Sequence, residues 1–405
     1  MVEHVLAKDG VASSKLVFRS SLLILRRRLS APLQFAIPLV DPISCRNRVP
    51  GRRSSAFDGQ GAPDDCDGGS LFLGYGVRVT AETIVVAAGT RPWVPEIEGL
   101  SDVPFITSDE ALRLPKQPQR LVIVGGGYIA AEMAHFFGDL GTEVTIIHRG
   151  PQLLRQEDEN VAARFTEVYQ RRFSMLLNAT IHRASRQGDE IVLDMASDGQ
   201  EETLTADALL LAVGRVPNTD LLDVAKSGVT VDDQGFVKTD DYLETNVPGI
   251  WALGDIVGRY LLKHSANLEA AFVGHNIFNP DSKVPVDYHA MPHAIFASPQ
   301  VASVGVTEQE AREAGLPVVS RLYNYYDTAY RSSIEDRDGF VKVLAHRETR
   351  EILGCHIIGS EASMLIQEVA NAMRRRLTTD AITQAIYVHP ALPEVVQRAF
   401  GGLPS

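Results

Sequence analysis

A single stretch of about thirty residues restricts the fold more than any other part of the 405-residue chain. The apolar run Leu121–Val124 predicts a short buried strand and leads directly into three consecutive glycines. A helix is expected from there through Phe137, and Glu143–Ile147 predicts a second strand. Strand, turn, helix and strand of this size form a βαβ unit, which implies a parallel sheet.

The glycine spacing in this unit is typical of a dinucleotide site. Gly125, Gly127 and Ala130 fit the G-x-G-x-x-A pattern between a strand and a helix. The first glycine permits the tight turn, the second lets the backbone approach a pyrophosphate, and the small third residue lets helix and strand pack closely. Because all elements of the unit are in place, we prefer nucleotide binding to a glycine turn without a ligand.

The end of the second strand indicates which dinucleotide is bound. NAD-selective sites usually have an acidic residue there, but this sequence has His148, followed by Arg149 and Arg155. Two guanidinium groups suit a 2′-phosphate, and no carboxylate lies at that place to repel it. We therefore expect NADPH; the alternative is that both arginines are ordinary surface charges.

The rest of the chain after about Leu71 is also predicted to be α/β. Further strands are expected at Val77–Val79, Thr83–Gly89, Leu209–Gly214 and Gly249–Asp255. From about Met291 the pattern changes and indicates a separate α+β domain. Its expected strands are Val341–Leu344 and Ile352–Ile358, and its expected helices are Glu308–Ala314 and Ser363–Arg375.

Composition excludes several classes of protein. Hydrophobic residues make up 45% and charged residues 22%, which is ordinary for a globular protein. No apolar run is long enough for a membrane helix, and a net charge of −12 argues against nucleic acid as a partner. The first 53 residues carry ten Lys/Arg and three Asp/Glu, but the order of charges and apolar residues does not fit a secretory signal, so we expect a cytoplasmic protein.

Several motifs, taken in order, are similar to those of one enzyme family. The chain from about Val77 to Leu403 resembles the flavoprotein disulfide reductases, which include glutathione reductase, lipoamide dehydrogenase, mercuric reductase and mycothione reductase. It looks most like mycothione reductase, through Leu261–Asn267 and Tyr387–Val396. The motifs that carry the family resemblance are Ala88–Pro92, Gly125–Glu132, Ala212–Asn218, Ala252–Asp255, and His389-Pro390 with Glu394.

The resemblance implies a domain order. We expect an α/β fold with a Rossmann-like NADPH-binding domain and a C-terminal α+β dimerisation domain. The FAD-binding domain is expected in two pieces and only in part. The implied ranges are 71–115 and 226–287 for FAD, 116–225 for NADPH and 288–405 for dimerisation, with 1–70 unassigned, either disordered or mistranslated.

The resemblance also implies roles for the cofactor-binding residues. Asp255 would contact the ribityl–pyrophosphate region of FAD, and Gly89 would lie near the flavin. After the glycine loop, the side chain of Tyr128, beside Ile129, would cover the flavin until nicotinamide displaces the tyrosine. Glu132 would face the nicotinamide. Gly214 and Arg215 would close the NADPH site. Taken alone, Asp255 could equally be a helix cap, Tyr128 a half-buried aromatic residue and Glu132 an acid that complements the helix dipole.

His389 and Glu394 are the expected catalytic residues. An imidazole exchanges protons near neutral pH, and the proline after His389 favours an extended backbone there. Glu394 is near enough in sequence to fold back onto the ring, where a carboxylate would fix its tautomer. The resemblance implies that this pair reaches the active site of a second copy, so the unit would be a homodimer.

Two parts of the family pattern are missing. No Gly-x-Gly-x-x-Gly unit precedes Gly125, and no Cys-x-x-x-x-Cys pair occurs. Cys45 and Cys66 are 21 residues apart, and Cys355 lies in an apolar strand. We expect a misplaced start or a frame error upstream. The histidines His264, His289, His293 and His356 show no metal-like pairing, so no metal site is expected.

The sequence therefore predicts an NADPH-dependent flavoprotein disulfide reductase whose activity is impaired in this chain. Hydride would pass from NADPH to FAD and on to a low-molecular-weight disulfide. One alternative is a flavin NAD(P)H oxidoreductase without a dithiol, which passes electrons to a quinone or to oxygen. Another is a non-catalytic dimer that binds NADPH.

Overall fold

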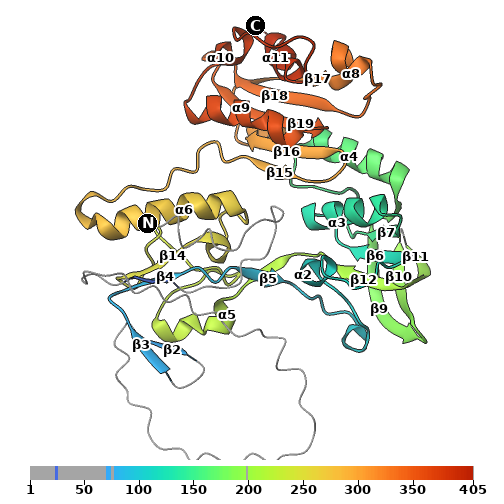
Figure 1. The fold of residues 1–405 in the computed structure, drawn as a ribbon, viewed down its shortest axis with the longest axis vertical. Coiled ribbons are helices and arrows are strands. Elements are labelled where there is room, and N and C mark those ends of the chain that lie inside the picture. The colour runs from blue at the N-terminus through green and yellow to red at the C-terminus, as the bar shows by residue number, and fades with distance from the viewer. Residues whose placement is uncertain (1–22, 26–69, 74–76, 198, 405) are drawn as a thin grey trace, which may run out of the picture. The chain divides into compact units, whose positions relative to one another are not determined.

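The computed structural model describes residues 23–25, 70–73, 77–197 and 199–404 (Figure 1). The described chain divides into two units. The first holds the residues up to Arg91 together with Arg215–Asp287, and the second holds Pro92–Gly214 and the chain from Tyr288 onward. The chain therefore passes from one unit to the other at 91/92, 214/215 and 287/288. The domain boundaries expected from the sequence were 115/116, 225/226 and 287/288.

The first unit is built on a small sheet. Strands β1 (Leu23–Leu25), β4 (Thr83–Val86) and β14 (Ile250–Ala252) lie in the order β1-β4-β14, with β4 and β14 parallel. The strand expected at Gly249–Asp255 ends at Ala252, because Gly254 has φ +75° and begins the 3-10 turn η4 (Gly254–Val257). The unit also contains β2 (Ser70–Leu73), β3 (Val77–Thr80), β5 (Thr90–Pro92), β13 (Arg215–Pro217), α5 (Thr219–Leu222), η3 (Val224–Ser227), α6 (Lys263–Phe278) and η5 (Pro280–Ser282).

The second unit begins with the predicted βαβ unit, whose elements are confirmed. Strands β12 (Ala208–Leu211), β6 (Arg120–Val124), β7 (Glu143–Ile147) and β8 (Ser174–Leu176) form one parallel sheet in that order. Helix α3 (Tyr128–Asp139) connects β6 to β7, and α4 (Glu159–Arg172) precedes β8. Two short elements come before this sheet, η2 (Leu100–Asp102) and α2 (Ser108–Ala111).

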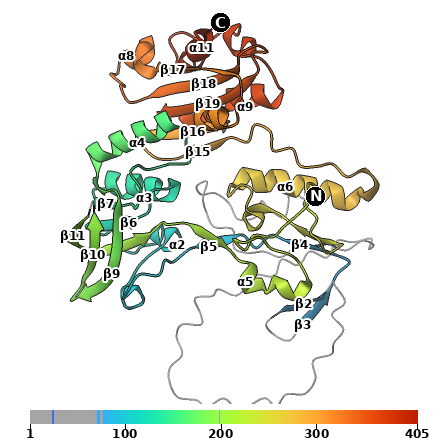
Figure 2. The same cartoon turned by 180° about the vertical axis from the view of Figure 1, so that it is seen from behind.

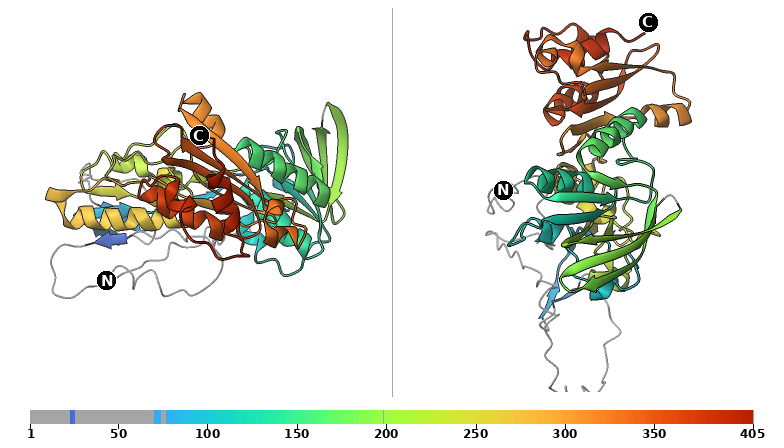
Figure 3. Two further views of the ribbon diagram at one scale, coloured as in Figure 1. Left: turned by 90° about the horizontal axis from the view of Figure 1, so that it is seen from above. Right: turned by 90° about the vertical axis from the view of Figure 1, so that its right-hand side faces the viewer.

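Alternate residues of this parallel sheet enter two different cores. Leu121, Ile123 and Ile146 pack with α3 and α4, whereas Val122 and Ile147 pack with an antiparallel three-stranded meander. The meander, light green in Figures 2 and 3, consists of β9 (Ala179–Gln187), β10 (Glu190–Ser197) and β11 (Gln200–Ala206) and was not predicted. Helices therefore cover one face of the parallel sheet and strands cover the other.

The C-terminal part of the second unit is an α+β domain, as expected. Its antiparallel sheet has the order β15-β16-β19-β18-β17, and helices α9 and α11 share one core with it (Figure 1). Among the described helices, none is both long enough and apolar enough to cross a membrane. The elements are β15 (His293–Ile295), β16 (Gln300–Gly305), α7 (Glu308–Glu313), β17 (Val318–Asn324), η6 (Tyr325–Asp327), α8 (Ala329–Ser332), β18 (Phe340–His346), β19 (Ile352–Gly359), α9 (Ala362–Arg374), α10 (Asp380–Thr383) and α11 (Glu394–Gly401).

Candidate functional site

The glycine loop between β6 and α3 has the conformation that phosphate binding needs. Gly125 has φ +136°, and a Cβ there would lie 2.2 Å from the carbonyl oxygen of Ala212, so only glycine fits. Gly127 is the N-cap of α3, and a Cβ there would meet no atom within 4 Å. No side chain caps α3, and Ala130 is buried against the core. The loop therefore leaves open space at the N-terminus of a 12-residue helix, where backbone N–H groups attract an anion.

The segment after β7 folds against this loop. The imidazole of His148 lies between Gly126 and Gly150, because a Cβ at either glycine would come within 2.7 Å of the ring. Burial, together with Arg155 and Arg149, lowers the pKa of His148, so the ring is neutral at neutral pH. Both arginines are exposed and form no ion pair with any residue that the structure describes. A neutral ring and two cations therefore lie at the end of β7.

Three further predicted residues lie on α3. Tyr128 and Ile129 are half-buried and pack against the core of the unit. Glu132 is buried, and its Oε1 accepts a hydrogen bond of 2.9 Å from the backbone N–H of Phe296. The carboxylate of Glu132 is therefore held by the backbone that follows β15.

The first unit contains the predicted flavin-contacting residue. Asp255 is half-buried, and burial raises its pKa. The hydroxyl of Thr90 donates to Asp255 Oδ2 at 3.2 Å and accepts from Arg215 Nε at 2.7 Å. Gly89, with φ +66°, precedes Thr90. Arg215 thus acts within the unit of Asp255, whereas Gly214, with φ +143°, is the last residue of the other unit before the crossing.

The two predicted catalytic residues are in contact. His389 Nδ1 lies 2.9 Å from Glu394 Oε1, and the backbone N–H of Ala391 donates to Glu394 Oε2 at 3.1 Å. These hydrogen bonds lower the pKa of Glu394, so the carboxylate is ionised and can only accept. His389 Nδ1 must therefore carry the proton, which leaves Nε2 on a side chain that is 67% exposed.

Comparison with known proteins shows the family of this chain. Residues 60–270 match the model of the pyridine nucleotide-disulphide oxidoreductases, and residues 291–400 match the dimerisation domain of the same family. Mycothione reductase of Mycobacterium tuberculosis is 41% identical over 347 residues, which cover 84% of this chain and 75% of the relative. This chain belongs to the pyridine nucleotide-disulphide oxidoreductase family.

Other members show the same relationship. Dihydrolipoyl dehydrogenase of Bacillus subtilis is 32% identical over 323 residues, covering 79% of this chain and 68% of the relative. The structure of the HOCl-induced flavoprotein disulfide reductase RclA from Escherichia coli superposes with a TM-score of 0.76 at 27% identity, covering 83% and 77% of the two chains. Family membership confirms the predicted fold class, and it places the chain among oxidoreductases that act on sulfur groups of donors.

Cysteine positions differ from what a dithiol site needs. Cys355 lies on β19, fully buried, and burial raises the pKa of its thiol, so it is not a reactive thiolate. Cys45 and Cys66 lie outside the described residues. Within the described part of the chain, no group of three or more His, Cys, Asp or Glu side chains is arranged to hold a metal ion.

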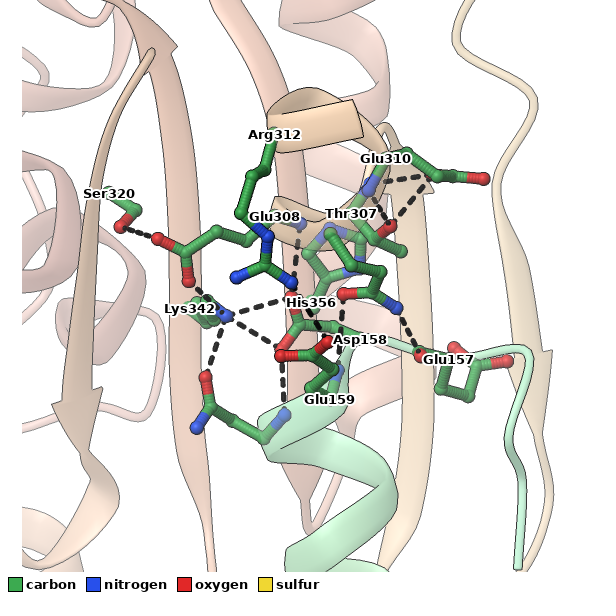
Figure 4. Close-up of polar contacts among 12 residues, drawn as sticks. Glu157, Asp158, Glu159, Thr307, Glu308, Glu310, Arg312, Ser320, Lys342 and His356 are labelled. Carbon is green, nitrogen blue, oxygen red and sulfur yellow. Dashed lines mark hydrogen bonds and ion pairs between the residues drawn. The ribbon is translucent and has the colours of Figure 1, made fainter. Parts of the chain in front are cut away.

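Sequence reasoning missed one buried polar cluster between the βαβ unit and the C-terminal sheet. Its centre is Lys342 on β18, which contacts Asp158 and Glu308 (Figure 4). The only local sign of this cluster is that Lys342 lies within a strand between two valines. The carboxylate that pairs with it lies 184 positions away in sequence, so no local pattern reveals the pair.

Proposed function

We propose that this chain binds NADPH and belongs to a flavoprotein disulfide reductase that acts in the cytoplasm as a homodimer. The observation that carries the proposal is the open N-terminus of α3 beside Arg149 and Arg155, which are exposed and form no ion pair with a described residue. A pyrophosphate fits the space that a Cβ at Gly127 would fill, and two guanidinium groups suit a 2′-phosphate.

The residues of the first unit fit part of an FAD site. Gly89 allows close approach of the backbone, and Asp255 offers a half-buried carboxylate beside Thr90. FAD, when bound, supplies two-electron transfer between nicotinamide and a disulfide. Burial favours the protonated form of Asp255, in which it can donate a hydrogen bond as well as accept the one from Thr90.

His389 and Glu394 support a role in proton transfer. Glu394 fixes the imidazole with its proton on Nδ1, so the exposed Nε2 can accept a proton from a thiol or, when protonated, return it to a leaving thiolate. Both residues lie in the dimerisation domain, and in a homodimer they would serve the site of the second copy. The preferred substrate is a low-molecular-weight disulfide such as mycothione, because mycothione reductase is 41% identical.

We further propose that disulfide reduction is impaired in these 405 residues, because their three cysteines include no closely spaced pair. The buried Cys355 and the 21-residue separation of Cys45 and Cys66 favour a second candidate, a flavin NAD(P)H oxidoreductase that uses a quinone or oxygen. A non-catalytic dimer that binds NADPH is the third.

The visible absorption spectrum of the purified chain, recorded before and after anaerobic NADPH, tests the proposal. A stoichiometric flavin band that bleaches supports a flavoenzyme, and disulfide and quinone acceptors then separate the first two candidates. Absence of a flavin band after incubation with FAD supports the non-catalytic dimer. Absence of NADPH binding in a direct titration would refute the first and third candidates, and absence of both NADPH and NADH binding would refute all three.

A further inference from the structure

One face of the C-terminal sheet carries a row of polar side chains. His293, Ser303, His356 and Lys342 lie directly opposite one another across the adjacent strands β15, β16, β19 and β18. Ser303, His356 and Lys342 are all at most 3% exposed. Their neighbours along the same strands, such as Val341 and Ile357, point to the other face and pack with α9 and α11. We call these four residues the polar row.

Two consecutive carboxylates from the segment between β7 and α4 contact this row. Glu157 Oε1 lies 2.7 Å from His293 Nε2, and Glu157 Oε2 accepts a 2.8 Å hydrogen bond from Ser303. Asp158 is fully buried, and both its oxygens accept from Lys342 Nζ at 2.8 Å. Burial raises the pKa of both carboxyl groups, but His293, followed by Ser303, keeps the pKa of Glu157 below its usual range, and Lys342 does the same for Asp158.

Lys342 has further partners that complete its coordination. Its Nζ donates to Asn160 Oδ1 at 2.6 Å and forms an ion pair of 2.6 Å with Glu308 Oε2, and Figure 4 shows it between Asp158 and Glu308. A buried ion pair of this kind is weak evidence for added stability, because desolvation offsets the attraction. Its alternative benefit is geometry, since charged hydrogen bonds fix a segment in one place.

The segment that these carboxylates fix is the one that carries the nucleotide-site arginines. Residues 148–158 contain Arg149 and Arg155 and end at the two carboxylates. The N–H of Glu157 donates to Leu154 O at 2.9 Å. The N–H of Leu154, which has φ +52°, donates to Gly126 O at 2.8 Å. Two backbone hydrogen bonds therefore connect the residue held by the polar row to the glycine loop.

We propose that Glu157 and Asp158 are positioning residues through which the C-terminal sheet sets the geometry, and hence the affinity, of the NADPH site. This inference rests on the proposed function only in that the site binds NADPH. The polar row holds one end of segment 148–158. Arg155 lies two residues before the held Glu157, and Arg149 lies at the other end, so both cations are on the segment that the row positions. Loosening the held end lets the arginines and the glycine loop sample other arrangements, which weakens binding without touching the ligand.

The test uses the full chain and measures Kd for NADPH, NADH and adenosine 2′,5′-bisphosphate by calorimetry. Glu157→Gln keeps the shape of the side chain, and the pair Asp158→Asn with Lys342→Met removes both buried charges together. The matched control is Arg171→Gln, since Arg171 of α4 also pairs with the C-terminal domain, through Asp338, but at an exposed place away from the segment. Thermal melting shows whether each variant is folded.

We expect both changes to raise Kd for NADPH and the bisphosphate by about tenfold in the folded protein, and Kd for NADH by less. The control should bind as the wild type does. If the two residues only stabilise the fold, the variants should have a lower melting temperature and unchanged Kd values for NADPH and the bisphosphate. That result would overturn the inference but not the proposed function. Failure of the wild type to bind NADPH would overturn both. Glu157→Gln decides the question if the double variant does not fold.

Discussion

The two glycines of the phosphate loop should fail in opposite ways when each is replaced by alanine. In Gly125→Ala the new methyl would lie 2.2 Å from the Ala212 carbonyl oxygen at a φ of +136°, so the backbone must move. We expect a loss of about 3 kcal/mol in the free energy of unfolding, from backbone strain and the contact together. For a unit of this size that lowers the melting temperature by about 6–12 °C.

In Gly127→Ala the methyl enters open space at an ordinary φ of −91°, so the fold tolerates it. The change in stability should stay within about 1 kcal/mol, the usual range for an N-cap residue. The same methyl occupies the path by which a pyrophosphate reaches the N-terminus of α3, so Kd for NADPH should rise by at least about tenfold.

Thermal melting and an NADPH fluorescence titration measure the two effects. Gly274→Ala in α6 serves as the control, since a Cβ there also meets no atom within 4 Å, and it should leave Kd for NADPH unchanged. Unaltered NADPH binding in Gly127→Ala would refute the assignment of the open space to the pyrophosphate. An unaltered melting temperature in Gly125→Ala would refute the argument from backbone geometry.

Three other predictions follow from the same sites. Replacing Arg149 and Arg155 together by glutamine should raise Kd for NADPH by about tenfold and leave NADH unaffected; an equal loss for both would contradict a 2′-phosphate site. Glu394→Leu, which leaves no acceptor for the ring, should shift His389 away from the Nδ1–H form in 15N NMR spectra, and an unchanged Nδ1–H form would show that the carboxylate does not fix the tautomer. Burial lowers the pKa of His356, so the unfolded state takes up its proton first and stability should fall as pH drops through about 6.5. Melting curves between pH 8 and 5 should show this fall, and it should be smaller in His356→Gln.

Local sequence predicted the strand, glycine turn and helix of the βαβ unit well because their determinants are local. Gly125, Gly127 and Ala130 are required by a turn, an open approach and a close packing contact that all lie within one βαβ unit. The contact between His389 and Glu394 was also expected, because five positions separate them and α11 begins at Glu394.

Other features depend on contacts that no short window of sequence contains. The meander β9–β11 was missed because its exposed positions are polar or charged and its buried positions, such as Ile191 and Leu193, matter only once they lie against the parallel sheet. In sequence, Lys342 is a single polar residue within an apolar strand. Its partner Asp158 lies 184 positions away, so the pair is recognised only in the folded structure. Tertiary structure, rather than local propensity, decides these positions.

The division of the chain also separates two binding functions that the family combines. The glycine loop, Arg149, Arg155 and the polar row all belong to the second unit, whereas Thr90, Arg215 and Asp255 belong to the first. The proposed contacts with the pyrophosphate and the 2′-phosphate therefore lie within the second unit, whereas Arg215, which was expected to close the NADPH site, belongs to the first. A chain that binds NADPH tightly without a flavin band would therefore be consistent with the proposed phosphate contacts of the second unit.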